Sequence, residues 1–143
     1  MADLSTCIHA TTVAIDGKGV LFQGASGSGK SDLALRLIDD GAILVADDQT
    51  SLRANDGTVL ASAPAELTGR LEVRGIGIVE VPVLAEAPIK MAVLLETDGE
   101  IDRLPDPTWI KLCDVEIPQI ALRAFEASAV AKLKQALRNV GST

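Results

Sequence analysis

Alternating and continuous apolar runs along the chain predict a series of β-strands. Residues 11–23 predict a β-hairpin, because two strand-like runs flank an Asp-Gly turn dipeptide at positions 16 and 17. Residues 51–64 predict a second hairpin around Asp56-Gly57 for the same reason. Further strands are predicted from short apolar runs at residues 42–48, 78–83 and 89–97, and a loop over residues 98–109.

Two stretches have helical spacing instead. Residues 31–41 place leucines on one wide face, carry Asp32 in the first turn where the helix dipole favours a carboxylate, and end at Gly41. The last stretch repeats apolar residues at helical intervals from Val130 to Val140, with Gly141 as the expected cap. We find no internal repeat and no linker, so residues 1–143 are predicted to form one α/β domain.

The composition narrows the class of protein. Apolar residues make up 48% of the chain but aromatic residues only 2%, which suits a core of branched aliphatic strands and disfavours base-stacking surfaces. The net charge is -7 and no run of Lys or Arg occurs, so we expect no nucleic-acid partner. Cys7 and Cys113 are far apart without metal-site spacing, which indicates reduced thiols. Without a signal peptide or a run of about 20 apolar residues, we expect a cytoplasmic protein with no membrane contact.

The segment GASGSGKS at residues 24–31 has the phosphate-binding pattern G-x-x-x-x-G-K-S/T between a predicted strand and a predicted helix. Its glycines let successive backbone N–H groups point at phosphate oxygens, Lys30 can reach the β- and γ-phosphates, and the Ser31 hydroxyl can bind Mg²⁺. The candidate nucleotide-binding residues are Gly24, Ala25, Ser26, Gly27, Ser28, Gly29, Lys30 and Ser31.

Three other features are candidates for chemistry. Asp47 and Asp48 follow a buried strand, 17 and 18 residues after Lys30, and could hold a metal through water or accept a proton; the alternative is a solvated turn. Adjacent residues of a strand point to opposite faces, so Asp47 and Asp48 need not share a role.

His9 is the only histidine, and it is either catalytic or a surface residue. The segment LEVRGIGIVEV at residues 71–81 combines Glu72, Arg74, Gly75 and Gly77, and fits a site loop or a strand bulge equally well.

Together, the segments GASGSGKSD, LVADD and LEVRGIGIVEV and the upstream His9 resemble the C-terminal catalytic domain of the HPr kinase/phosphorylase family, in the same order and at about the same spacing. The resemblance covers residues 7–100. It implies an α/β fold shared with phosphoenolpyruvate carboxykinase, with mixed β-sheets and flanking helices. It also implies a bacterial enzyme that uses ATP and Mg²⁺ to phosphorylate a serine of an HPr-like phosphocarrier protein of the sugar phosphotransferase system, and that assembles as a homo-hexamer.

The resemblance also implies roles for individual residues. His9 falls at the active-site histidine, Lys30 is catalytic, Ser31 and Glu72 bind the metal, and Asp47 is the proton acceptor. Residues 71–80, which include Arg74, Gly75 and Gly77, match a stretch that serves both reaction directions.

Two departures from the family pattern are visible. Full-length relatives carry an additional N-terminal domain, and a glycine-arginine-asparagine segment that follows the run resembling IPQIAL has no match here. We therefore expect the reverse, phosphorylase reaction to be weaker than the kinase reaction. The alternatives are a small-molecule kinase or NTPase, and a nucleotide-sensing module without catalytic activity.

Overall fold

The computed structural model describes residues 5–140, which form a mixed α/β structure. Two α-helices and a short 3-10 helix accompany the strands: α1 (Lys30–Asp39), α2 (Ala129–Val140) and η1 (Ala65–Leu67). The strands are β1 (Ser5–His9), β2 (Thr11–Ile15), β3 (Lys18–Gln23), β4 (Ile43–Ala46), β5 (Gln49–Asn55), β6 (Thr58–Ser62), β7 (Arg70–Val73), β8 (Gly77–Glu80), β9 (Ala87–Leu95), β10 (Thr108–Leu112) and β11 (Val115–Leu122).

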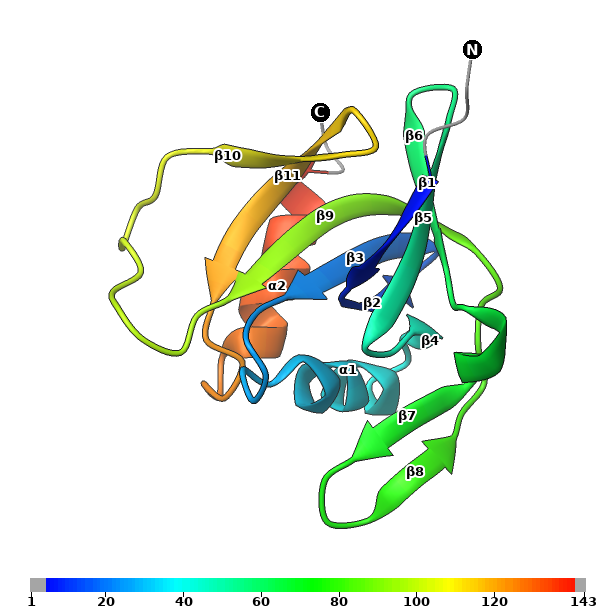
Figure 1. The fold of residues 1–143 in the computed structure, drawn as a ribbon. Coiled ribbons are helices and arrows are strands. Elements are labelled where there is room, and N and C mark those ends of the chain that lie inside the picture. Colours follow the sequence, from blue (N-terminus) through cyan, green and yellow to red (C-terminus); the bar gives the residue numbers. More distant parts are fainter. Residues whose placement is uncertain (1–4, 141–143) are drawn as a thin grey trace.

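Nine of these strands form one curled sheet, and β7 and β8 form a separate two-stranded sheet (Figure 1). The order in the large sheet is β1-β5-β6-β9-β3-β2-β4, with β11 also paired to β9 and β10 paired to β11. The long strand β9 pairs in parallel with β3 and β11, and antiparallel with β6 at its beginning. Because β3 is central and buried, the loop that follows it starts from a rigid position.

Both faces of the central strands are buried, in two separate apolar clusters. In β3, Val20 and Phe22 belong to the cluster that also contains Leu33 and Leu37 of α1 and Leu133 of α2. The intervening Leu21 belongs to the second cluster, where it joins residues of β5, β6 and β11. This alternation follows from the two-residue period of a strand, so the helices cover one face of the sheet and the curl of the sheet itself covers the other.

Most of the predicted elements are confirmed. Both Asp-Gly hairpins form, as β2–β3 and β5–β6, and the predicted helices form as α1 and α2. Gly41 ends α1 as expected, with a φ of 105° and its N–H donated to the Ile38 carbonyl. The expected cap at Gly141 lies outside the described residues.

Other boundaries differ from the prediction. The strand predicted at residues 78–83 is β8, which ends at Glu80, and the loop predicted through residue 109 gives way to β10 at Thr108. Strands β1, β7, β10 and β11 were not predicted as strands.

Candidate active site

The glycine-rich segment connects β3 to α1 as a tight loop. Residues 24–29 lie between the end of β3 at Gln23 and the start of α1 at Lys30. Gly27 and Gly29 adopt φ values of 84° and 100°, which side chains disfavour. At Gly24, an added Cβ would lie 2.5 Å from the Ser28 hydroxyl oxygen and 2.9 Å from the Leu95 carbonyl oxygen, so only glycine fits. The local structure therefore needs the glycines that define the motif.

Lys30 and Ser31 begin the helix immediately after this loop. The Lys30 ammonium donates hydrogen bonds to the carbonyl oxygens of Gly24 at 2.8 Å and Ala25 at 3.2 Å, which holds the cation across the loop. Four N–H groups at the start of any α-helix have no partner within the helix, and the dipole adds positive potential there. A cation and free N–H groups at one point are the elements of an anion site.

Asp47 lies buried beneath the loop, with 8% of its surface exposed. Its Oδ1 accepts hydrogen bonds from the hydroxyls of Ser31 at 2.7 Å and Thr11 at 3.0 Å, and its Oδ2 accepts one from the backbone N–H of Glu72 at 3.1 Å. One carboxylate thus ties β2, α1 and β7 together. Three donors surround the Asp47 carboxylate, and one of them is the hydroxyl of Ser31.

Asp48 is exposed and lines the cavity above the loop. Its φ of 68° is left-handed, a conformation that aspartate tolerates better than most residues, and it turns the chain at the end of β4. Its carbonyl oxygen accepts the N–H of Ala10 at 3.0 Å, which brings the end of β1 alongside. His9, the last residue of β1, lines the same cavity.

The segment at residues 71–81 is a hairpin rather than a bulge in a strand. β7 and β8 pair antiparallel, with Glu72 opposite Ile78, and the bend between the strands projects over the cavity. Arg74 and Ile76 lie at this bend, where Ile76 is 77% exposed. An exposed isoleucine and an arginine at the rim of a polar cavity are available to contact a bound molecule.

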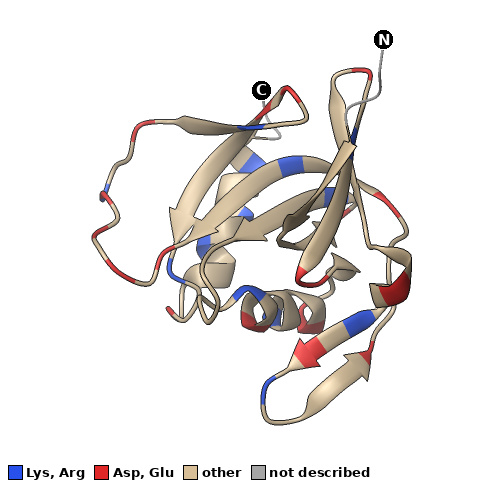
Figure 2. Cartoon of the chain, viewed as in Figure 1, with Lys and Arg blue, Asp and Glu red and all other residues tan. Residues whose placement is uncertain are grey.

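The loop, the strand ends and the hairpin enclose one cavity of about 800 Å³. Figure 2 shows basic residues at the beginning of α1 and at the bend of the hairpin, on a chain whose net charge is -7. The cavity brings together most of the sequence-predicted site: His9, Gly24, Ser26, Gly27, Gly29, Lys30, Ser31, Glu72, Arg74, Gly75 and Gly77. Ala25, Ser28 and Asp47 do not line it.

Sequence reasoning missed three cavity residues, namely Asp32 and Leu35 of α1 and Phe125 after β11, whereas Val73 and Ile76 lie within the predicted segment 71–80. It also missed Thr11, whose hydroxyl donates to Asp47. A threonine among apolar residues in a buried strand is a usable signal, because a buried hydroxyl needs a partner. No pattern in the sequence indicates that Phe125 reaches the loop.

The described residues hold no cluster of three or more His, Cys, Asp or Glu side chains suited to a metal. The two cysteines are free. Burial raises the pKa of the Cys113 thiol, and the negative charge of the neighbouring Asp114 raises it further. Within residues 5–140 no helix combines the length and the hydropathy that crossing a membrane requires.

The fold and the site define an α/β protein whose glycine-rich loop leads from a central strand into a helix beside paired aspartates and a short hairpin. The family model of the HPr serine kinase C-terminal domain matches residues 2–140 of the chain, so the chain belongs to this family. A solved structure of the Hpr(Ser) kinase/phosphatase from Coxiella burnetii has the same fold, with a TM-score of 0.83 at 26% sequence identity over 94% of this chain and 95% of that chain.

Curated relatives carry the name HPr kinase/phosphorylase. The protein of Lactococcus lactis subsp. lactis is 41% identical over 126 residues, which cover 80% of this chain and 41% of the relative. The protein of Clostridium botulinum strain Eklund 17B is 42% identical over 109 residues, which cover 69% of this chain and 36% of the relative. The chain thus spans about two fifths of the length of these relatives.

Proposed function

We propose that the chain is an ATP-dependent protein-serine kinase whose substrate is an HPr-like phosphocarrier protein. The observation that carries the proposal is the single cavity in which the glycine-rich loop, Lys30, Asp48 and the β7–β8 hairpin meet. Membership of the HPr serine kinase family supports the choice of reaction and substrate. Phosphoryl transfer depends chiefly on positioning and on neutralising charge, and this cavity supplies groups for both.

The loop and the start of α1 bind the phosphates in this proposal. Backbone N–H groups of residues 24–31 donate to the β- and γ-phosphate oxygens, and Lys30 leaves its contacts with the Gly24 and Ala25 carbonyls to pair with them. The same loop also fits inorganic phosphate chains, so the phosphate end alone does not select a nucleoside.

Ser31 and Glu72 are proposed to bind Mg²⁺, which neutralises phosphate charge when it is bound. The donor set fits this ion, because Mg²⁺ prefers oxygen ligands and commonly takes only one or two from the protein, the rest being water and phosphate. Asp47 accepts the Ser31 hydroxyl hydrogen and the Glu72 N–H, so it holds both proposed ligands in place.

Asp48 is the better candidate for the proton acceptor that was predicted at Asp47. The acceptor must come within hydrogen-bond reach of the substrate hydroxyl, and Asp48 lines the cavity whereas Asp47 is buried below it. In the proposed reaction, the Asp48 carboxylate takes the proton of the serine hydroxyl as its oxygen attacks the γ-phosphorus, and ADP leaves. His9 lies beside Asp48, and Arg74 faces the same space from the hairpin, where it can neutralise the transferring group.

The test is incubation of the purified chain with labelled ATP, Mg²⁺ and a purified HPr-like protein, followed by mass spectrometry of the modified residue. Phosphoserine on the phosphocarrier, lost when its serine is replaced by alanine, supports the proposal. ATP turnover on small molecules with no protein product favours the small-molecule kinase, and nucleotide binding without turnover favours the sensor. The cytoplasmic location, the hexamer and the weaker reverse reaction stay predictions.

A further inference from the structure

The segment between β11 and α2 brings an exposed aromatic ring to the phosphate loop. Phe125 is 67% exposed, whereas its neighbour Ala124 is 1% exposed. The ring lies against Gly29, because an added Cβ on Gly29 would be 3.0 Å from the Phe125 Cζ and 2.6 Å from the Ala124 Cβ. Phe125 therefore lines the same cavity as the loop while most of its surface stays free.

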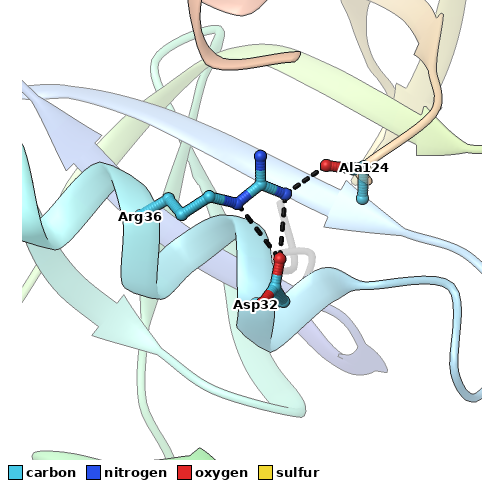
Figure 3. A network of polar contacts seen from close by, with 3 residues as sticks. All are labelled: Asp32, Arg36 and Ala124. Carbon is cyan, nitrogen blue, oxygen red and sulfur yellow. Dashed lines mark hydrogen bonds and ion pairs between the residues drawn. The ribbon is translucent and has the colours of Figure 1, made fainter. Parts of the chain in front are cut away.

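A polar network fixes this segment to the helix that follows the loop (Figure 3). Arg36 of α1 donates a hydrogen bond to the Ala124 carbonyl oxygen and pairs with Asp32 one turn earlier at 2.9 Å. The backbone next to Phe125 is thus held to the first turns of α1. A ring on an anchored segment loses less entropy when it contacts a ligand than a ring on a mobile loop would.

The groups proposed to bind the metal and the attacking hydroxyl leave the Phe125 side of the cavity for the nucleoside. Glu72, Asp48 and His9 lie toward the hairpin and the ends of β4 and β1, where the metal and the attacking hydroxyl are proposed to bind. Figure 1 shows the β11–α2 connection beside the beginning of α1 and apart from the β7–β8 hairpin. A nucleotide with its γ-phosphate toward the hairpin must therefore extend its ribose and base in another direction, and Phe125 lies there.

The chain has few aromatic residues that could serve a base. It contains two Phe, one Trp and no Tyr. Phe22 is fully buried in the core, and Trp109 lies on β10 outside the cavity lining. Among residues 5–140, Phe125 is the only one of these aromatic side chains that lines the cavity.

We propose that Phe125 stacks on the nucleobase of the bound nucleotide and provides the affinity for the nucleoside that the phosphate loop alone does not. The inference rests on the proposed ATP-dependent function. Stacking uses the π-face that every base has, so we expect it to favour nucleotides over inorganic phosphates and to discriminate little between ATP and GTP. Alanine substitution at a stacking aromatic costs about 5- to 150-fold in affinity per base, and a single ring that covers one face should give roughly 5- to 20-fold.

The experiment is isothermal titration calorimetry of the wild type and the Phe125→Ala variant with the Mg²⁺ complexes of ATP, GTP and inorganic tripolyphosphate. We expect Phe125→Ala to weaken ATP and GTP by roughly 5- to 20-fold and to leave tripolyphosphate unchanged. Phe125→Trp should restore the affinity for both nucleotides. Trp109→Ala, the other exposed aromatic, is the matched control and should leave all three affinities unchanged.

Each other outcome overturns a different statement. Equal losses for ATP and tripolyphosphate in Phe125→Ala would show that the ring shapes the loop and does not contact the base. Unchanged ATP affinity in that variant would reject the stacking contact while the phosphate site stood. A wild type that binds neither ATP nor tripolyphosphate would reject the proposed function itself, and the stacking contact with it.

Discussion

Exchanging each of the adjacent aspartates for asparagine should separate the supporting role of Asp47 from the direct catalytic role of Asp48. Asp47→Asn keeps the shape of a buried side chain but removes its charge and one of its two acceptor oxygens. The carboxylate accepts three hydrogen bonds, from Ser31, Thr11 and the Glu72 N–H. Asp48→Asn makes the same chemical change on an exposed side chain that lines the cavity.

The expected loss for Asp47→Asn follows from its contacts. A hydrogen bond to a charged group contributes about 1.5–3 kcal/mol, and one between neutral groups about 0.5–1.5 kcal/mol. The two hydroxyls can turn to accept from the new amide, and the amide oxygen can keep the Glu72 N–H, so most of the loss is the change from charged to neutral bonds. We expect a destabilisation of about 1–3 kcal/mol, which lowers the Tm by roughly 3–10 °C for a domain of this size.

Asp48→Asn should leave stability within about 0.5 kcal/mol, because the residue is exposed and asparagine tolerates the left-handed backbone there as well as aspartate does. Phosphoryl transfer should fall by about 10²–10⁴-fold, since an amide cannot accept the serine proton. Asp56→Asn is the matched control, because Asp56 is also exposed, has a φ of 51° and lies in the turn between β5 and β6, outside the cavity lining. It should change neither property.

The assays are thermal and urea unfolding of the three variants, and transfer rates to an HPr-like protein at saturating ATP. Transfer by Asp48→Asn at the wild-type rate would remove Asp48 as the base. Wild-type stability in Asp47→Asn would show that its three hydrogen bonds contribute little, and the assignment of Asp47 as the support for Ser31 would fail with it.

Three further predictions concern single side chains. Lys30→Ala should lower phosphoryl transfer by at least about 10²-fold and weaken ATP binding while the fold survives, as checked by kinetics and circular dichroism; normal ATP turnover would refute the phosphate-loop assignment. Glu72→Gln should raise the Mg²⁺ concentration needed for half-maximal activity, whereas Glu80→Gln on the same hairpin should not. If the Mg²⁺ titrations of Glu72→Gln and the wild type coincide, Glu72 does not bind the metal. Cys113 should react with iodoacetamide more slowly than the exposed Cys7 near pH 8, because the raised pKa of Cys113 lowers its thiolate fraction. Mass spectrometry measures both labelling rates, and faster labelling of Cys113 would contradict this prediction.

The elements that could be predicted are those with local signals. The hairpins β2–β3 and β5–β6 have an Asp-Gly turn between strand-like runs, and both formed as expected. The β10–β11 hairpin has no such signal, because its left-handed turn is made by Cys113 and Asp114, with φ values of 48° and 62°. Pro118 within β11 further lowers its strand propensity. β1 is largely exposed and pairs with the distant β5, so its sequence alone does not indicate a strand.

The candidate site could be predicted as a set of segments but not as a set of orientations. The loop, Asp48, the hairpin segment and His9 line one cavity, whereas Asp47 lies outside its lining. Which aspartate faces that cavity depends on the left-handed turn at Asp48 and on donors from Thr11, Ser31 and the backbone of Glu72, which come from three other elements. Tertiary contacts of this kind leave no local pattern, and the same holds for Phe125 against Gly29.

The charge of the cavity predicts how the removal of Mg²⁺ affects nucleotide binding. The lining contains three carboxylates, Asp32, Asp48 and Glu72, against the two cations Lys30 and Arg74, on a chain with a net charge of -7. The loop N–H groups and the helix dipole contribute only about half a positive charge, which is too little to offset a triphosphate. Nucleotide binding should therefore depend strongly on a divalent cation. With excess EDTA, ATP affinity should fall by at least tenfold, and the loss should be larger for ATP than for ADP, which carries less charge. Equal ATP affinity with and without Mg²⁺ would mean that the loop and Lys30 suffice, and it would remove the argument for Glu72 as a metal ligand.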